Sequence, residues 1–177
     1  MDLILNSNPI AIFVFIWLSI YFVLTIAISI YKYLSITALY LQEKRSLKSL
    51  MKNKMLTTKS ILTSCDASSI YSVCRLETLK NSTSGLSFLS MISSTAPFIG
   101  LFGTIVSILE TFKSLGSAKF VSLNLLAPSI SEALVVTAVG IFVAIPAYSM
   151  HILLSRKINT YMSTIDQQIE ILKTLKK

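Results

Sequence analysis

Two long apolar segments, 93–109 and 123–147, constrain this chain more than any other feature, because each carries a stripe of small residues at helical spacing. Steps of three and four residues keep side chains within about 40° of one line along a helix. The first stripe comprises Ser93, Pro97, Gly100, Thr104, Ser107 and Thr111, and the second comprises Ala133, Thr137, Gly140, Ala144 and Ala147. In water a packed helix face is stabilised by large apolar side chains, whereas in lipid small residues let helix backbones approach closely. The stripes therefore predict packed membrane helices.

The composition agrees with a membrane location. The chain has 177 residues, of which 53% are hydrophobic and only 14% are charged. Soluble domains have about a quarter of their residues charged. The mean hydropathy of +0.71 also indicates a membrane protein. We therefore predict an all-α integral membrane protein with three transmembrane helices, of which the second and third are long and extend into the cytoplasm.

The net charge of +8 does not indicate nucleic-acid binding, because the cations lie beside the apolar spans. Nine of the 16 Lys and Arg residues fall between Lys32 and Lys80, and five follow His151. This distribution is typical of cytoplasmic loops of membrane proteins. Cys65 and Cys74 lie in the same basic segment, so we expect reduced thiols there, and they have no His pattern that would indicate a metal site.

The pattern of apolar and basic segments predicts a topology with a periplasmic N-terminus. The segments are a periplasmic N-terminus (1–9), a first transmembrane helix (10–31), a cytoplasmic helical region (32–85), a second transmembrane helix (86–109), a periplasmic loop (110–122), a third transmembrane helix (123–150) and a cytoplasmic amphipathic helix (151–177). A cleaved signal peptide is the rival interpretation of the first apolar run, but that run is too long and its leader lacks Lys and Arg. A solvated basic loop remains an alternative for 32–80, and a helix bound to the membrane surface remains one for the last segment.

Two motifs resemble the MotA, TolQ and ExbB superfamily of proton-channel subunits, most closely the ExbB and TolQ branch. The first motif, at 94–104, reads STAPFIGLFGT, and the second, at 127–140, reads APSISEALVVTAVG and is followed by AIPA at 144–147. The resemblance is strong over 93–150, and the N-terminal half has no motif of its own.

The resemblance implies a pentamer whose lumen, lined by the second and third spans, holds a dimer of single-span ExbD- or TolR-like partners. Proton flow would drive motion that is passed to TonB or TolA, in the inner membrane of a Gram-negative bacterium. By motif position, Thr104 and Thr137 would be lumen hydroxyls and Glu132 the required acid. The remaining candidates would serve helix packing: Ser93, Pro97, Gly100, Gly103, Ser107, Ala133, Gly140, Ala144 and Ala147.

Other interpretations of the same residues stay open at this point. The segment from Ser129 to Glu132 also fits a capping box at a helix start, and the two threonines could simply bond back to their own helices. A TolQ-type envelope function and a passive scaffold without ion flux are the alternative functions, and a four-span MotA-type stator fits less well. Because no nucleophile is paired with a base, we predict no catalytic residue and no enzymatic activity. We also predict no metal and no cofactor.

Overall fold

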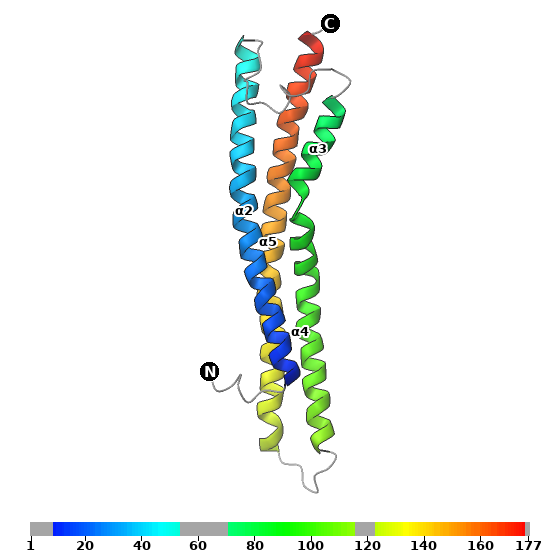
Figure 1. Ribbon diagram of the computed structural model, residues 1–177. Coiled ribbons are helices and arrows are strands. Elements are labelled where there is room, and N and C mark those ends of the chain that lie inside the picture. The colour runs from blue at the N-terminus through cyan, green and yellow to red at the C-terminus, as the bar shows by residue number, and fades with distance from the viewer. Residues whose placement is uncertain (1–8, 54–70, 116–122, 176–177) are drawn as a thin grey trace. The chain divides into compact units, whose positions relative to one another are not determined.

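The computed structural model describes residues 9–53, 71–115 and 123–175, and these are helical except for a turn at Ser84 and Gly85. The helices are α2 (Pro9–Asn53), α3 (Tyr71–Thr83), α4 (Leu86–Leu115) and α5 (Leu123–Leu175), as labelled in Figure 1. Three stretches of the described chain are long and apolar enough to cross a membrane: Ile12–Lys52, Tyr71–Lys113 and Ala127–Thr174. The predicted all-α fold with three membrane-length helical stretches is confirmed.

The chain forms two compact units. Of the described residues, those within Met1–Ala27 and Phe88–Ser149 form the first unit, and those within Ile28–Ser87 and Met150–Lys177 form the second. Helices α2, α4 and α5 therefore supply residues to both units, whereas α3 belongs to the second unit alone.

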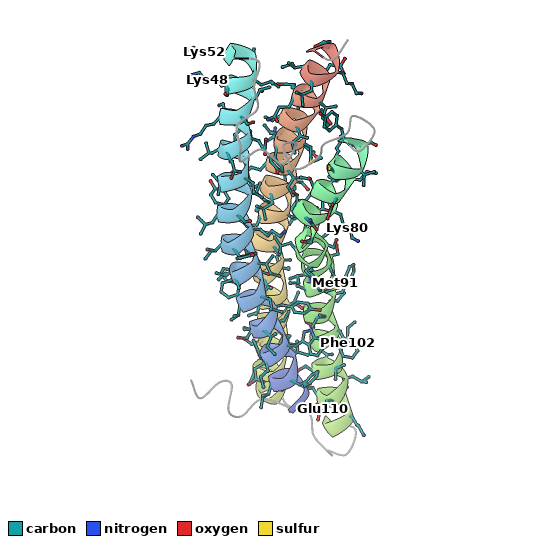
Figure 2. The ribbon with its side chains drawn as sticks, turned by 45° about the horizontal axis from the view of Figure 1, so that its top comes forward. Lys48, Lys52, Lys80, Met91, Phe102 and Glu110 are labelled. Carbon is teal, nitrogen blue, oxygen red and sulfur yellow. The ribbon has the colours of Figure 1, made fainter. Side chains whose placement is uncertain are left out.

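In the first unit, α2, α4 and α5 lie side by side around an apolar core (Figure 1). The buried members of this core are Val14, Leu18, Ile92, Ala96, Val136, Val143, Ala144 and Ala147. In the most apolar 18-residue stretch of each span, only 22% to 33% is buried within the protein. Large side chains such as Phe98 and Phe102 are exposed on α4, where Figure 2 labels Phe102. A surface of this kind requires lipid or other helices around it, because in water it would be an exposed apolar patch.

The second unit has a different core, built from large side chains. The stripe predicted from residue 154 onward is buried here, at Leu154, Ile158, Met162, Ile165 and Ile169 of α5. From α2, Ile36 and Leu50 are buried as well. Burial of large apolar side chains stabilises packed helices, so these residues hold α2 and α5 together in the second unit.

A buried polar contact joins α2 to α5 within the second unit. Glu43 is 1% exposed and Gln168 is fully buried. The Gln168 Nε2 group donates to the Glu43 carbonyl oxygen at 2.9 Å and to its carboxylate Oε2 at 3.0 Å. Because burying a carboxylate is costly without hydrogen bonds, a shift of one helix along the other would remove these bonds at a high cost. The contact therefore fixes the register of the two helices.

The turn between α3 and α4 combines one glycine with a contact from α2. Gly85 has a φ of 88°, which side chains other than glycine rarely adopt. The Lys32 ammonium of α2 donates to the Asn81 carbonyl and to Ser84 Oγ, each at 3.0 Å. Partial burial lowers the pKa of Lys32. A cation at a helix C-terminus satisfies free carbonyls and complements the helix dipole, so Lys32 stabilises the end of α3.

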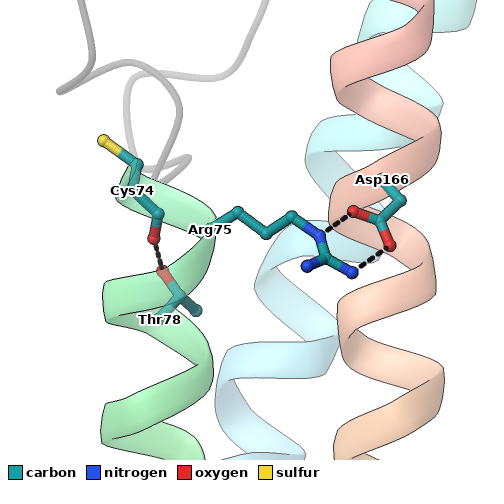
Figure 3. Close-up of polar contacts among 4 residues, drawn as sticks. All are labelled: Cys74, Arg75, Thr78 and Asp166. Atoms are coloured by element: carbon teal, nitrogen blue, oxygen red, sulfur yellow. Dashed lines mark hydrogen bonds and ion pairs between the residues drawn. The ribbon is translucent and has the colours of Figure 1, made fainter. Parts of the chain in front are cut away.

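An ion pair connects α3 to α5, also within the second unit (Figure 3). Arg75 donates from Nε and Nη2 to the two carboxylate oxygens of Asp166, the second bond measuring 3.0 Å. Hydrogen bonding to Asp166, followed by its charge, raises the pKa of Arg75. The side chains are 39% and 44% exposed, so the pair orients α3 more than it stabilises the unit.

The expectation of reduced cysteines is wrong for Cys74, which is disulfide-bonded. The compartment of a segment predicts which redox state is favoured, but not which sulfur atoms the fold brings together. Cys65 lies outside the described residues.

Candidate functional site

Two threonine hydroxyls meet between α4 and α5 in the first unit. Thr104 Oγ1 and Thr137 Oγ1 are hydrogen-bonded to each other. Thr104 Oγ1 is also 3.1 Å from the Gly100 carbonyl oxygen and 3.2 Å from that of Ala133, and Thr137 Oγ1 is 3.2 Å from the Gly100 carbonyl oxygen. Thr104 is 9% exposed, and Thr137 is half-buried. The motif residues are therefore brought together within one protomer.

This arrangement can change its hydrogen-bond direction without moving any heavy atom. Each hydroxyl has one proton to donate and can also accept. Either threonine can donate to the other while the second donates to a backbone carbonyl. A pair with two such states can adjust to a changing charge nearby, which is a property that a polar site in an ion pathway requires.

Close backbone contact makes the hydroxyl pair possible. A Cβ atom added at Gly140 would lie 2.8 Å from the Ala96 carbonyl oxygen and 3.0 Å from the Gly100 Cα. At Gly100 it would lie 3.1 Å from the Thr137 Cα. Side-chain carbons essentially never approach to 2.8 Å, and 3.0 to 3.1 Å is tighter than nearly all of their contacts. Helices α4 and α5 therefore touch through their glycines, as small-residue membrane interfaces do.

The other residues predicted to serve helix packing differ in their burial. The buried ones are Gly103, Ser107, Ala133, Ala144 and Ala147. Ser93 and Pro97 are half-buried, and the Ser93 hydroxyl donates to the Ser90 carbonyl of its own helix at 2.8 Å. A Cβ at Gly103 would lie 2.6 Å from Val136 Cγ1. The middle of each stripe thus lies at the α4–α5 contact, while the N-terminal end of the first stripe is partly open.

Glu132 lies inside a helix and not at its start. Helix α5 begins at Leu123, well before Ser129, so the capping-box interpretation is wrong. A capping box needs the first turn of a helix, where backbone N–H groups have no partner. Glu132 is half-buried, and its carboxylate accepts no hydrogen bond from the described residues.

Glu110 is a second carboxylate of the first unit, which the sequence interpretation did not include. Its Oε2 atom is buried and has no hydrogen-bond partner among the described residues, and Figure 2 labels the residue on α4. The available signal was its spacing, three residues after Ser107 on the first stripe. It was missed because the second span was ended at 109, whereas α4 continues to Leu115.

Both carboxylates lie on the same side of the threonine pair along the helix axes. Contacts of Gly100 with Gly140 and of Thr104 with Ala133 show that α4 and α5 are antiparallel. Glu110 follows Thr104 by six residues, and Glu132 precedes Thr137 by five. At 1.5 Å per residue these offsets are about 9 and 7.5 Å, so the acids belong to the end of the unit that contains the C-terminus of α4.

The three membrane-length stretches, with hydroxyl groups and carboxylates in one apolar unit, define a polytopic helical membrane protein with polar groups at a helix–helix contact. A family model described as the MotA/TolQ/ExbB proton channel family matches residues 42–167. The chain belongs to this family.

The chain is similar over almost its whole length to a biopolymer transport protein of Helicobacter pylori named ExbB-like 1. The two are 37% identical over 179 residues, which cover 97% of this chain and 95% of the relative. Shorter matches include the Tol-Pal system protein TolQ of Haemophilus influenzae, 41% identical over 55% of this chain and 43% of that protein. The biopolymer transport protein ExbB of Pseudomonas putida is 40% identical over 49% of this chain and 26% of that protein.

Proposed function

We propose that this chain is the channel subunit of a proton-driven motor, which uses the proton motive force to energise TonB-dependent transport across the outer membrane. The observation that carries the proposal is the hydroxyl pair of Thr104 and Thr137 at the contact of two apolar helices, in a member of a proton channel family. Two carboxylates, Glu110 and Glu132, belong to the same unit.

The threonine pair would act by orienting a proton carrier and not by releasing protons itself. A threonine hydroxyl keeps its proton at physiological pH, whereas a carboxylate can titrate. We therefore assign the titrating group within the membrane to a single-span partner of the ExbD or TolR type, held by a pentamer of this chain. Glu132 would add negative charge on the approach to the pair, and the remaining stripe residues would hold α4 against α5.

The choice of the TonB pathway rests on the relatives. The match that covers nearly the whole chain is to a protein named ExbB-like, whereas the TolQ match covers about half. A TolQ-type role in the Tol-Pal envelope system is the second candidate, because TolQ of Haemophilus influenzae is 41% identical over 55% of this chain, a similar identity to that of ExbB of Pseudomonas putida. In both cases the protein would lie in the inner membrane of a Gram-negative bacterium, without enzymatic activity.

The proposal is tested with Thr137→Val and Glu132→Gln. Valine replaces the hydroxyl by a methyl group of the same shape, and Thr104 keeps the Gly100 and Ala133 carbonyls as acceptors, so the variant should fold. Glu132 has no hydrogen bond to the described residues, so glutamine should also be tolerated. We expect each variant to assemble normally and to lose proton flux and energised import by about tenfold or more.

Thr95→Val is the matched control. Thr95 is also on α4, but its hydroxyl donates to the Met91 carbonyl of its own helix at 2.8 Å, so flux should stay within about twofold of the wild type. Oligomer size is measured by native mass spectrometry and flux in vesicles that contain the subunit with its partner. Normal flux in assembled Thr137→Val would contradict the role given to the threonine pair. Absence of flux in the wild type would contradict the motor and favour a passive scaffold.

A further inference from the structure

A groove between α2 and α5 in the second unit has the dimensions of a ligand site. Its volume is about 550 Å³, within the usual range for small-molecule pockets. The side chains that line it include Tyr33, Tyr40 and Leu41 of α2 and Leu153, Arg156 and Lys157 of α5. No residue among those that line the groove is acidic. Aromatic and aliphatic walls thus surround two cationic groups.

The two cations are arranged differently, and each is suited to bind an anion. Lys157 Nζ lies 3.4 Å from the centre of the Tyr33 ring and donates to Thr37 Oγ1 at 2.9 Å. An ammonium has three donors, so Lys157 is held in place and keeps N–H groups for a ligand. Arg156 is exposed, and its guanidinium has no carboxylate partner among the described residues. A free guanidinium can bind a phosphate through two parallel hydrogen bonds.

The groove lies along the chain where the membrane-spanning segments are predicted to end. Tyr33 follows the predicted end of the first span, at 31, by two residues, and Leu153 follows that of the third, at 150, by three. From Leu153 to Thr160 the α5 wall rises about 10.5 Å, enough to cross the headgroup layer on one side of a bilayer, which is about 5–7.5 Å thick. On α5 the apolar Leu153 comes before the two cations, on the side of the predicted span, and the Tyr33 ring lies against Lys157. This order matches a phospholipid, whose phosphate lies above its acyl chains.

We propose that this groove binds the headgroup of an anionic phospholipid of the cytoplasmic leaflet. The phosphate lies between Arg156 and Lys157, and the upper acyl chain follows Leu153 and Tyr33. Basic pockets beside transmembrane helices on the cytoplasmic side are suited to such lipids because the site charge and the lipid charge are opposite. The proposal concerns the second unit only and does not depend on the proton pathway in the first.

The experiment compares phosphatidylglycerol with phosphatidylcholine on the purified, delipidated oligomer in mild detergent. Bound lipid per protomer is counted by native mass spectrometry, and the thermal midpoint is followed in parallel. The wild type should retain phosphatidylglycerol and be stabilised by it, and should retain little phosphatidylcholine. The double variant Arg156→Gln with Lys157→Gln should bind phosphatidylglycerol about tenfold or more weakly, since each cation near the surface contributes to the attraction.

Two further variants keep the test decisive. Arg156→Gln alone removes a guanidinium that has no carboxylate partner among the described residues, so it should fold even if Lys157→Gln does not, and it should weaken binding severalfold. Lys48→Gln with Lys52→Gln removes the same charge from exposed positions at the end of α2 (Figure 2), outside the groove, and should stay within about twofold of the wild type. Equal retention by the groove and control variants, or equal binding of both lipids, overturns the proposal. Dissociation of the oligomer by the groove variants with unchanged lipid per protomer also overturns it, and assigns the groove to a second copy of the chain.

Discussion

At the scale of single residues, Tyr161 shows that the second unit carries an energetic cost in its core. It is the largest fully buried side chain among the described residues, and its hydroxyl has no hydrogen-bond partner among them. Burial, with a smaller contribution from the charge of Glu43, raises the pKa of the phenol. The neutral form is therefore favoured in the folded state.

We predict that Tyr161→Phe stabilises the protein by about 1 kcal/mol near neutral pH, because it removes a buried hydroxyl without a partner. The pH dependence follows from the raised pKa. In the unfolded chain the phenol loses its proton near pH 10, so wild-type stability falls as pH rises above about 10, and the Phe variant lacks this loss. Thermal unfolding in detergent between pH 8 and 11 measures both effects. Tyr31→Phe, at a residue that is 72% exposed, is the control, and parallel curves for wild type and Tyr161→Phe would contradict the prediction.

The residues of the candidate site differed in how well sequence could locate them. Thr104 and Thr137 stood out because spacing puts small residues on one face, and the motif resemblance singled out the same two positions. That their hydroxyls bond to each other could not be predicted, since it depends on the relative register of α4 and α5. Glu110 was missed for a related reason: whether a carboxylate at a helix end is buried depends on how far the helix continues.

At the scale of helices, the α4–α5 contact depends on the absence of side-chain atoms at its centre. We predict that Gly140→Ala lowers the free energy of unfolding by about 1–3 kcal/mol, because the new methyl group would meet backbone atoms of Ala96 and Gly100 that cannot move aside independently. It should also weaken the threonine pair. Thermal unfolding in detergent measures the loss. Ala138→Leu, which adds more volume at an exposed position of the same helix, should change the midpoint little, and an equal loss in both variants would argue against the contact.

Sequence patterns predicted which stretches are helical better than where single helices begin and end. The large-residue stripe of α5 was evident because water-facing and buried positions alternate with helical period. The continuity of α2 through Asn53 was less evident, because its hydrophobic pattern changes at Lys32 while its helix propensity does not. At Gly85 the reverse is seen, because the helix is interrupted where the composition does not change. A positive φ at this one residue separates α3 from α4. Backbone conformation at one glycine is a tertiary outcome, and here it is associated with the Lys32 contacts.

At the scale of the whole molecule, the distribution of cations predicts which ends of the helices face the cytoplasm. Nine Lys and Arg residues between Lys32 and Lys80 and five after His151 contrast with two, Lys113 and Lys119, in the predicted periplasmic segment 110–122. Positive charge is retained on the cytoplasmic side during insertion. With this orientation, Glu110 and Glu132 would lie between the threonine pair and the periplasm, on the side from which the proton motive force drives protons inward.

We therefore predict that a cysteine in place of Lys113 reacts with a membrane-impermeant maleimide in intact spheroplasts, whereas cysteines in place of Lys48 or Lys173 react only after lysis. All three positions are exposed, so burial within the protomer should not hide them, and the background carries Cys65→Ser and Cys74→Ser, so that the introduced cysteine is the only one in the chain. Labelling after denaturation confirms that each cysteine is present. If Lys48→Cys and Lys173→Cys are labelled in intact spheroplasts and Lys113→Cys is not, the orientation is reversed, and the two carboxylates would then lie on the exit side of the threonine pair and could not serve as a proton entrance.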